Sequence, residues 1–434
     1  MRTIFFIILT TCVTKLSAQD STLITGDTIR WNLATCIDYA KKNNITVNTL
    51  RLDAKYNEQN VIAAKGQMQP DLSGSVTQSL THYNSGFYPS SGYGVNSSLT
   101  LYNGGYIRNN IKSTQLALAA SNLDVEASNN DITLSITEAY LNILLARETI
   151  MYQQDVVNTS EAIVKQAQQR FDTGMIAQKD LLETQATLAN DKYILVADEN
   201  TLRQNILTLK QILQLPTDAL FNVSANDSIT PVSLVAGLHE AEVIALNTRP
   251  EVKSSALSLE VQQTEVEKAK YSLRPSLTLG GSVGSSYSRN SLGEKYFSQV
   301  NNNFNQNLGL TLSVPIFDRQ ITKTNVEKAK IDVDIAKLNL QNTKTTLSQQ
   351  VEQAYINVQN AQQQYIAANE QLKYSEEAYR IANEQLKIGS YNIVDYLQQK
   401  NLYVQALQSY LQAKYSSALY TKIYNFYTGV PVTQ

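Results

Sequence analysis

Few side chains in this sequence have the types and spacing that a catalytic or metal site requires. The only two histidines, His82 and His239, lie on different segments, and such a pair does not specify a metal site. The glycine-rich run from Gly280 to Gly284 precedes no helix pattern and lacks the Lys-Ser or Lys-Thr of a phosphate-binding loop. No nucleophile elbow, paired-carboxylate spacing or cysteine–histidine set occurs in a supporting context. We therefore predict no enzyme activity, no cofactor and no metal ion.

The N-terminus is typical of a secretory signal peptide. An apolar stretch from Ile4 to Val13 is followed by a short segment that ends near the small residue Ala18. We predict that residues 1–18 are this signal and exclude them from the fold. Cys12 is a poor lipidation site because the bulky Thr11 precedes it, so we expect it to be unlipidated.

Removal of the signal leaves Cys36 as the only cysteine, which excludes an internal disulfide, a cysteine metal cage and a redox CxxC pair. The net charge of −2 and the 17% of charged residues do not suggest nucleic-acid binding. No run of about 18 apolar residues follows the signal, so no helix is expected to span a bilayer. Any membrane crossing must therefore use strands.

Two copies of one pattern fill the rest of the chain. In each copy a glycine precedes an aspartate by six residues, at Gly174–Asp180 and at Gly389–Asp395, which sets an offset of 215 residues. Upstream, Pro70 and Pro275 begin matching segments at an offset of 205 residues. The second copy therefore carries ten extra residues, which we expect in a loop, where added length costs little.

Apolar residues seven apart predict long coiled-coil helices on both sides of each glycine. Small residues recur between the large ones, which lets two helices approach closely. The spacing resumes after each glycine, with leucines in copy one and mostly tyrosines in copy two. The first arm, from Tyr106 to Asp172, would span roughly 100 Å at 1.5 Å per residue. We call the row of residues at this seven-residue spacing the seam of the helix. Its large members before Gly174 are Ile136, Ile143, Ile150, Val157, Val164 and Phe171.

Each copy also contains two segments in which apolar residues alternate with small or polar ones, the pattern of a half-buried strand. They are Leu72–Val76, Val95–Leu101, Leu277–Val283 and Leu308–Val314. We expect Thr81–Gly94 and Ser285–Asn303, which are rich in Tyr, Ser, Gly and Asn, to be loops on the solvent side.

The two copies divide the mature chain into repeat 1, residues 19–230, and repeat 2, residues 231–434. Repeat 1 has a helix, a β-hairpin at residues 70–103 and a long helical hairpin with its tip near Gly174. Repeat 2 has the same order, with its β-hairpin at residues 275–317 and its tip near Gly389.

Four strands cannot close a membrane pore, because closed barrels begin at about eight strands and an open edge in lipid leaves backbone groups unpaired. The protomer must therefore share its barrel. Three chains would supply twelve strands, and the same symmetry would gather their helical arms into a tube. The predicted fold class is an α+β membrane protein with a shared 12-stranded transmembrane β-barrel on a long α-helical coiled-coil barrel.

Several features together carry a family resemblance. They are the paired helix starts at residues 31–44 and 240–251, the strand starts at Pro70 and Pro275, and the two glycine tips. The chain resembles the TolC-like outer-membrane efflux proteins over nearly all of its mature length. The resemblance implies a homotrimer in outer-membrane lipid with its helical tunnel in the periplasm. It also implies docking to a periplasmic adaptor protein and an inner-membrane transporter, which would decide what passes.

Two sets of candidate functional residues follow. The tips are expected to be the adaptor-docking end, at Thr173, Gly174, Gly389 and Ser390. The tunnel-constriction candidates are Asp395, Gln398 and Asp180. The best-known family members carry more than one acidic residue after the second tip, whereas here Asp395 is followed one turn later by Gln398. An Asp in the first turn of a helix can equally serve only to stabilise that helix through its dipole. Two interpretations of Asp395 and Asp180 therefore stay open: they line the constriction, or they simply stabilise their helices.

The main alternative is a secreted coiled-coil scaffold or adhesin that conducts nothing. This interpretation explains the helical seams. It gives no role to the two alternating hairpins, which recur at the same place in each copy.

Overall fold

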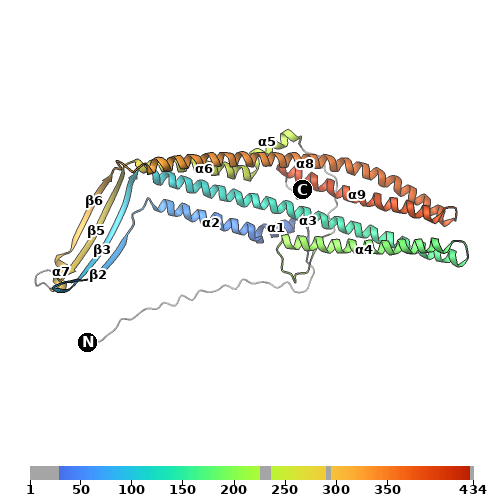
Figure 1. Cartoon of the computed structure of the whole chain (residues 1–434), viewed down its shortest axis with the longest axis horizontal. Helices are drawn as coiled ribbons and strands as arrows, with labels where there is room; N and C mark the ends of the chain where they lie inside the picture. The colour runs from blue at the N-terminus through green and yellow to red at the C-terminus, as the bar shows by residue number, and fades with distance from the viewer. Residues whose placement is uncertain (1–28, 225–235, 290–294, 431–434) are drawn as a thin grey trace, which may run out of the picture.

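The structure is a computed structural model that describes residues 29–224, 236–289 and 295–430. The predicted signal peptide with Cys12, and the predicted repeat boundary at residues 230 and 231, lie outside the described residues. Figure 1 shows an elongated molecule in which a β-sheet occupies one end and long helices extend from it to the other.

The helices form two sets in the same order, two shorter helices followed by two long ones. The first set is α1 (Leu33–Asn43), α2 (Ile45–Gly66), α3 (Tyr106–Asp172) and α4 (Gln178–Ile212). The second set is α5 (Leu238–Thr248), α6 (Pro250–Lys270), α8 (Ile321–Lys387) and α9 (Ile393–Tyr427). Helices α3 and α8 each have 67 residues, and α4 and α9 each have 35. These equal lengths confirm the internal repeat.

Seam residues form the core between the helices. Ile143, Val351 and Val358 are fully buried, and the small residues Ala354 and Ala361 lie buried beside them. This packing joins α3 to α4 and α8 to α9. Each buried branched side chain contributes about 1.5–3 kcal/mol relative to an exposed one. The large-and-small seam read from the sequence is therefore the core of two helical hairpins.

Cys36 lies in α1 and is fully buried among apolar residues of α3 and α4. Burial raises the pKa of its thiol to about 12, so the group stays neutral and unreactive. Its role is that of a small apolar helix residue.

The main sheet combines one hairpin from each repeat. Its strands are β2 (Ser73–Tyr83), β3 (Gly86–Asn103), β5 (Ser276–Ser288) and β6 (Asn305–Ser313). They lie in the order β2-β3-β5-β6, and every neighbouring pair is antiparallel. The central β3–β5 pair joins the two repeats, which leaves β2 and β6 as the edges.

The expectation that residues 81–94 form a loop is wrong. Strand β2 continues to Tyr83 and β3 starts at Gly86, so only two residues separate them. Thr81 pairs with Tyr88, and Tyr83 pairs with Gly86. Ladder hydrogen bonds join backbone groups, so a segment poor in apolar residues can still be a strand if its partner is in register.

The second expected loop, residues 285–303, is also partly wrong. Strand β5 runs to Ser288, and a short helix, α7 (Tyr296–Asn302), precedes β6. The ten extra residues of the second copy therefore include a helix.

Two short strands were not predicted from the sequence. Strand β1 (Ile29–Trp31) pairs in parallel with β4 (Phe221–Val223), next to the buried cluster around α1. A 3-10 turn, Tyr271–Leu273, links α6 to β5. Among the described helices, none is long and apolar enough to cross a membrane.

Candidate functional site

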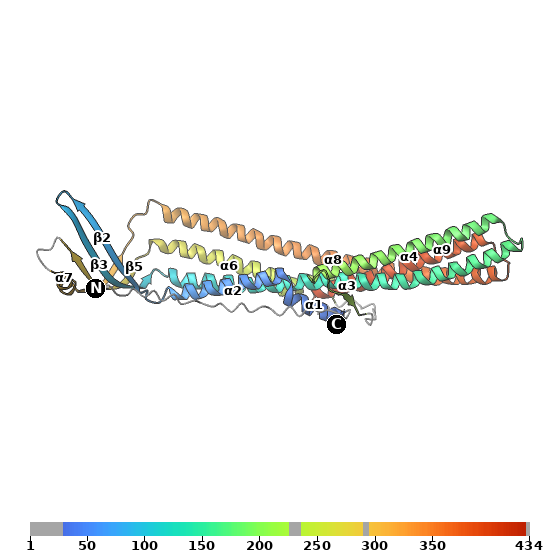
Figure 2. The ribbon, with the colours of Figure 1, turned by 90° about the horizontal axis from the view of Figure 1, so that it is seen from below.

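The tips of both helical hairpins lie at the same end of the molecule, far from the sheet (Figures 1 and 2). Gly174 and Gly389 have φ values of +75° and +79°, the left-handed conformation that glycine adopts at helix C-termini. The amide of Met175 donates to the Arg170 carbonyl at 2.8 Å, and that of Ser390 donates to the Gln385 carbonyl at 3.0 Å. The glycines thus close α3 and α8, as their spacing predicts.

The four predicted docking residues, Thr173, Gly174, Gly389 and Ser390, are all exposed. The two hydroxyl groups donate to carbonyls of the preceding helical turn, Thr173 to Gln169 at 3.1 Å and Ser390 to Gln385 at 3.2 Å.

Sequence reasoning missed two apolar residues beside them. Met175 is 74% exposed and Ile388 is 79% exposed. The end of the molecule therefore offers apolar as well as polar contact.

The three constriction candidates lie close behind the tips. Asp180 is half-buried in the first turn of α4, whereas Asp395 and Gln398 are exposed on α9. The N-cap of α9 is Asn392, whose side chain accepts from the Val394 amide at 2.9 Å. Asp395 is therefore not the capping residue of its helix, although its charge still suits the positive end of the helix dipole.

A buried ion pair ties the two hairpins together, and sequence reasoning missed it. The Lys400 ammonium of α9 donates to the Asp191 carboxylate of α4 and to the Ser160 hydroxyl of α3. Ser160 also donates to Asp191 at 2.5 Å. The side chains of Lys400 and Asp191 are only 3% and 8% exposed. Lys400 lies four residues after Tyr396, on the same face of α9. A lysine in an apolar seam is the one feature of the sequence that could have identified it.

A second link between the hairpins lies nearer the tips. The Arg170 guanidinium of α3 donates to the Leu386 carbonyl at 2.7 Å, at the C-terminal end of α8. A cation at this position offsets the negative end of the helix dipole. Together with the ion pair, it fixes hairpin one against hairpin two within one chain.

Tyrosines in the second hairpin replace the leucine seam of the first. The rings of Tyr379 and Tyr403 stack with centroids 5.0 Å apart and planes 6° from parallel. The hydroxyls of Tyr379 and Tyr396 are 3.1 Å apart, and Tyr396 is fully buried. Burial raises the pKa of Tyr396 well above its ordinary value, so the seam stays uncharged.

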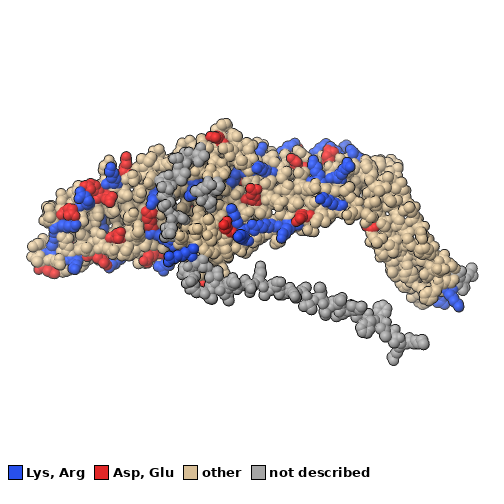
Figure 3. Space-filling model, turned by 180° about the vertical axis from the view of Figure 1, so that it is seen from behind, with Lys and Arg blue, Asp and Glu red and all other residues tan. Residues whose placement is uncertain are grey.

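The four-stranded sheet has one apolar and one polar face. Val95 pairs with Val283 on one face, and the adjacent pair, Asn96 with Ser282, lies on the other. None of the four strands contains Asp, Glu, Lys or Arg. Figure 3 shows this contrast on one side of the molecule, where charged residues cover the helices and are nearly absent from the sheet. The apolar face is made by Val76, Leu80, Val95, Leu99, Leu279, Val283, Leu308, Leu310 and Leu312.

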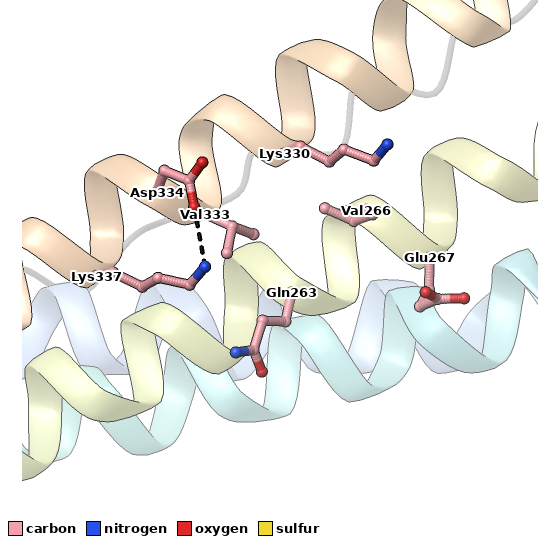
Figure 4. A pocket seen from close by; sticks show the side chains of 7 residues that line it. All are labelled: Gln263, Val266, Glu267, Lys330, Val333, Asp334 and Lys337. Atoms are coloured by element: carbon pink, nitrogen blue, oxygen red, sulfur yellow. Dashed lines mark hydrogen bonds and ion pairs between the residues drawn. The ribbon is translucent and has the colours of Figure 1, made fainter.

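A groove of about 410 Å³ lies between α6 and α8 (Figure 4). Its charged side chains are paired with neighbours on their own helices. Lys337 contacts Asp334 at 2.9 Å, and Lys330 contacts Glu327 at 2.8 Å. Because the charged side chains of the groove already have partners, we assign no ligand to it. Within the described ranges, no group of three or more His, Cys, Asp or Glu could hold a metal ion.

Known proteins are similar to most of the chain. A family model described as outer membrane efflux protein matches residues 36–214 and 243–419. The chain is 24% identical over 226 residues to the toxin and drug export protein A of Aggregatibacter actinomycetemcomitans, covering 51% of this chain and 48% of that protein. It is 26% identical over 273 residues to the outer membrane protein TolC of Escherichia coli, covering 59% and 53%. The chain thus spans about half the length of the curated relatives it matches.

The fold is also that of a solved channel. A crystal structure of CusC, reported with the formation of a transmembrane channel, superposes with a TM-score of 0.82 at 16% identity and covers 92% of each chain. At this identity the likeness establishes the fold alone.

Proposed function

Because the chain belongs to the outer membrane efflux protein family, a family of channels and not of enzymes, we propose that three copies assemble into an outer-membrane efflux duct. Each copy contributes four strands to a 12-stranded barrel in the outer membrane, and the helices form a tunnel in the periplasm. A periplasmic adaptor and an inner-membrane transporter deliver the substrate to this tunnel.

The observation that carries the proposal is the two-faced sheet. Its apolar face presents large side chains to the outside, with Val76 75% exposed and Leu308 80% exposed. Its other face is built of Ser, Thr, Asn and Gly, which suits a water-filled lumen. Strand β2 has 11 residues and β5 has 13, and a tilted strand of about 9–11 residues spans a bilayer.

The sheet edges require partners. Within one chain β2 and β6 each pair on one side only, and every residue of both strands is exposed. An open edge in lipid leaves backbone groups without hydrogen bonds, at a cost of several kcal/mol for each group. Pairing of β6 with β2 of the next copy removes both edges, and three copies close the ring.

The helical part also exposes surfaces that a trimer would bury. Leu52 and Tyr56 of α2 are 65% and 69% exposed, and Ile331 and Leu338 of α8 are 59% and 66% exposed. Large apolar side chains that recur along one helix mark an interaction surface. Packing of these faces between copies gives a continuous tube of helices below the barrel.

The tips are proposed to dock the adaptor. Thr173, Gly174, Gly389 and Ser390 form the end of the chain farthest from the sheet, and Met175 beside them adds apolar contact. Asp395, and with it Gln398 and Asp180, would line the narrow periplasmic opening in a trimer. Three Asp395 carboxylates around such an opening attract cations and repel anions.

Two adjacent residues of β6 provide the test. Leu310 is on the apolar face and Thr311 on the polar face, and both are exposed. Leu310→Arg places a charge in lipid, which costs about 2–4 kcal/mol at the bilayer centre, so membrane assembly should fall sharply. Thr311→Arg should assemble normally and shift the ion preference of the pore toward anions. Equal tolerance of both variants, with no conductance from either, would refute the duct and favour a secreted scaffold.

A further inference from the structure

The short helix α7 packs against β5 at the end of the sheet farthest from the long helices. Its side chains contact the face that carries the apolar residues. The hydroxyl groups of Tyr296 and Tyr93 form a hydrogen bond, and the ring centroids of Tyr287 and Tyr296 are 4.7 Å apart. Tyr93 and Tyr287 project from the same face as Val95 and Val283, because residues two apart on a strand share a face.

Hydrogen bonds between side chains and backbone groups hold α7 in place on the sheet. The Ser285 hydroxyl donates to the Val300 carbonyl, and the Ser288 amide donates to the Gln299 side chain at 3.1 Å. Ser91, beneath the helix, is only 4% exposed, and it is the one buried residue of the four strands. Helix α7 therefore packs firmly on the sheet.

One large apolar residue of α7, Phe297, is exposed, and its ring lies 5.3 Å from the Tyr296 ring. Phe297 is 83% exposed, and Phe304, just after the helix, is 55% exposed. Two exposed basic residues, Arg289 and Lys295, precede the helix, and Glu294 lies between them in the sequence. An aromatic side chain beside basic residues, next to an apolar barrel wall, has the chemistry of a helix at a lipid headgroup boundary.

We propose that α7 is a membrane-surface anchor that binds lipid of the outer leaflet. Phe297 enters the upper part of the acyl chains, and Arg289 and Lys295 contact the phosphate groups of anionic lipid headgroups. The inference rests on the proposed function, because the apolar face meets lipid only if the sheet is part of a membrane barrel. It goes beyond that function by assigning α7 to the outer wall and by giving it a lipid class.

The face assignment excludes a role as a plug. A helix that narrowed the pore would pack on the lumen face, against residues such as Ser90 or Ser286. The side chains that α7 contacts, Tyr93, Ser285 and Tyr287, belong to the other face.

Tryptophan fluorescence in vesicles tests the proposal. Trp31, the only tryptophan, is replaced by Phe, and a single Trp is introduced into the full chain in each of three variants. Phe297→Trp reports on α7, Leu310→Trp reports on the lipid face of the barrel, and Tyr88→Trp reports on the lumen face. The vesicles contain phosphatidylcholine with brominated acyl chains, which quench only residues in contact with lipid.

We expect bromines near the headgroup to remove most of the Phe297→Trp emission and to leave Tyr88→Trp emission unchanged. If Leu310→Trp is quenched but Phe297→Trp responds only to a water-soluble quencher, the anchor is refuted while the barrel stands. If Leu310→Trp is not quenched, the proposed function itself fails.

Charge selectivity is measured with the same variant. Brominated phosphatidylglycerol should quench Phe297→Trp more strongly than brominated phosphatidylcholine, and salt should reduce the difference. Adding Arg289→Gln and Lys295→Gln should bring the ratio of the two quenching efficiencies to one. A ratio that is unchanged by these substitutions would refute the role of the two basic residues.

Discussion

Loss of one partner of the buried ion pair should destabilise the helical region strongly. Lys400→Met removes the ammonium and leaves the Asp191 carboxylate, 8% exposed, with the Ser160 hydroxyl at 2.5 Å. An unpaired buried charge costs about 3–5 kcal/mol, because its desolvation is no longer offset. We expect Lys400→Met to lower the free energy of unfolding by about this amount.

The neighbouring exposed ion pair between α3 and α4 provides a control. Lys192 of α4 contacts Glu161 of α3 at 2.8 Å, with side chains 53% and 52% exposed. Exposed pairs contribute about 0–1 kcal/mol, so Lys192→Met should change little. The double variant Lys400→Met with Asp191→Leu should recover most of the lost stability, since an apolar replacement of a buried pair is often neutral.

The assay is urea unfolding of the detergent-purified protein, followed by the helical circular dichroism signal. Trimer content is measured in parallel, so that unfolding of the helices is separated from dissociation. Equal midpoints for Lys400→Met and Lys192→Met would refute the reasoning, as would a double variant no more stable than Lys400→Met.

Three further predictions concern the tips, the opening and the tyrosine seam. Thr173→Arg or Ser390→Arg should impair export while leaving the trimer and its membrane insertion intact, which pull-down of a periplasmic adaptor from exporting cells would check. Asp395→Asn should lower the cation preference measured from reversal potentials, more than Asp180→Asn does; a helix-dipole role alone predicts instead a loss of about 0.3–1 kcal/mol at both sites and no change in selectivity. Tyr424 is fully buried, its hydroxyl donates to the Ala236 carbonyl at 2.9 Å, and burial raises its pKa to about 12. The pKa of Tyr424 in the folded protein is above the value near 10 expected in the unfolded chain, so the stability that neutral Tyr424 contributes is complete below about pH 10 and is lost between about pH 10 and 12. Tyr424→Phe should reduce this loss of stability at alkaline pH in melting curves. Replacement of the exposed Tyr193 by Phe should not.

The helical arms were predictable because their signals are local and repeated. The seam from Ile136 to Phe171 and the glycine at position 174 set the first hairpin, and α3 ends at Asp172 as expected. A left-handed glycine turn depends on its own few residues, so it can be read from one sequence. The same argument applies at Gly389.

The sheet was only partly predictable, because strand length depends on pairing. Residues 81–94 carry few apolar side chains, and their strand character comes from the ladder that joins β2, β3 and β5. Helix α7 is held by contacts with β5 and β3 that no local pattern reveals.

The ion pair of Asp191 and Lys400 was hidden for a similar reason. The two residues are 209 positions apart and do not occupy equivalent places in the two repeats. Neither the seam spacing nor the internal repeat could therefore align them. Only the packing of α9 against α3 and α4 brings them together.

The central claim is that three copies form one conducting pore, and single-channel recording of the purified oligomer tests it most directly. The oligomer is first sized by light scattering in detergent and then inserted into a planar bilayer. We predict a mass of three chains and discrete current steps whose ion preference shifts toward anions with Thr311→Arg. A folded, membrane-inserted monomer, or a trimer that inserts without any current steps, would contradict it.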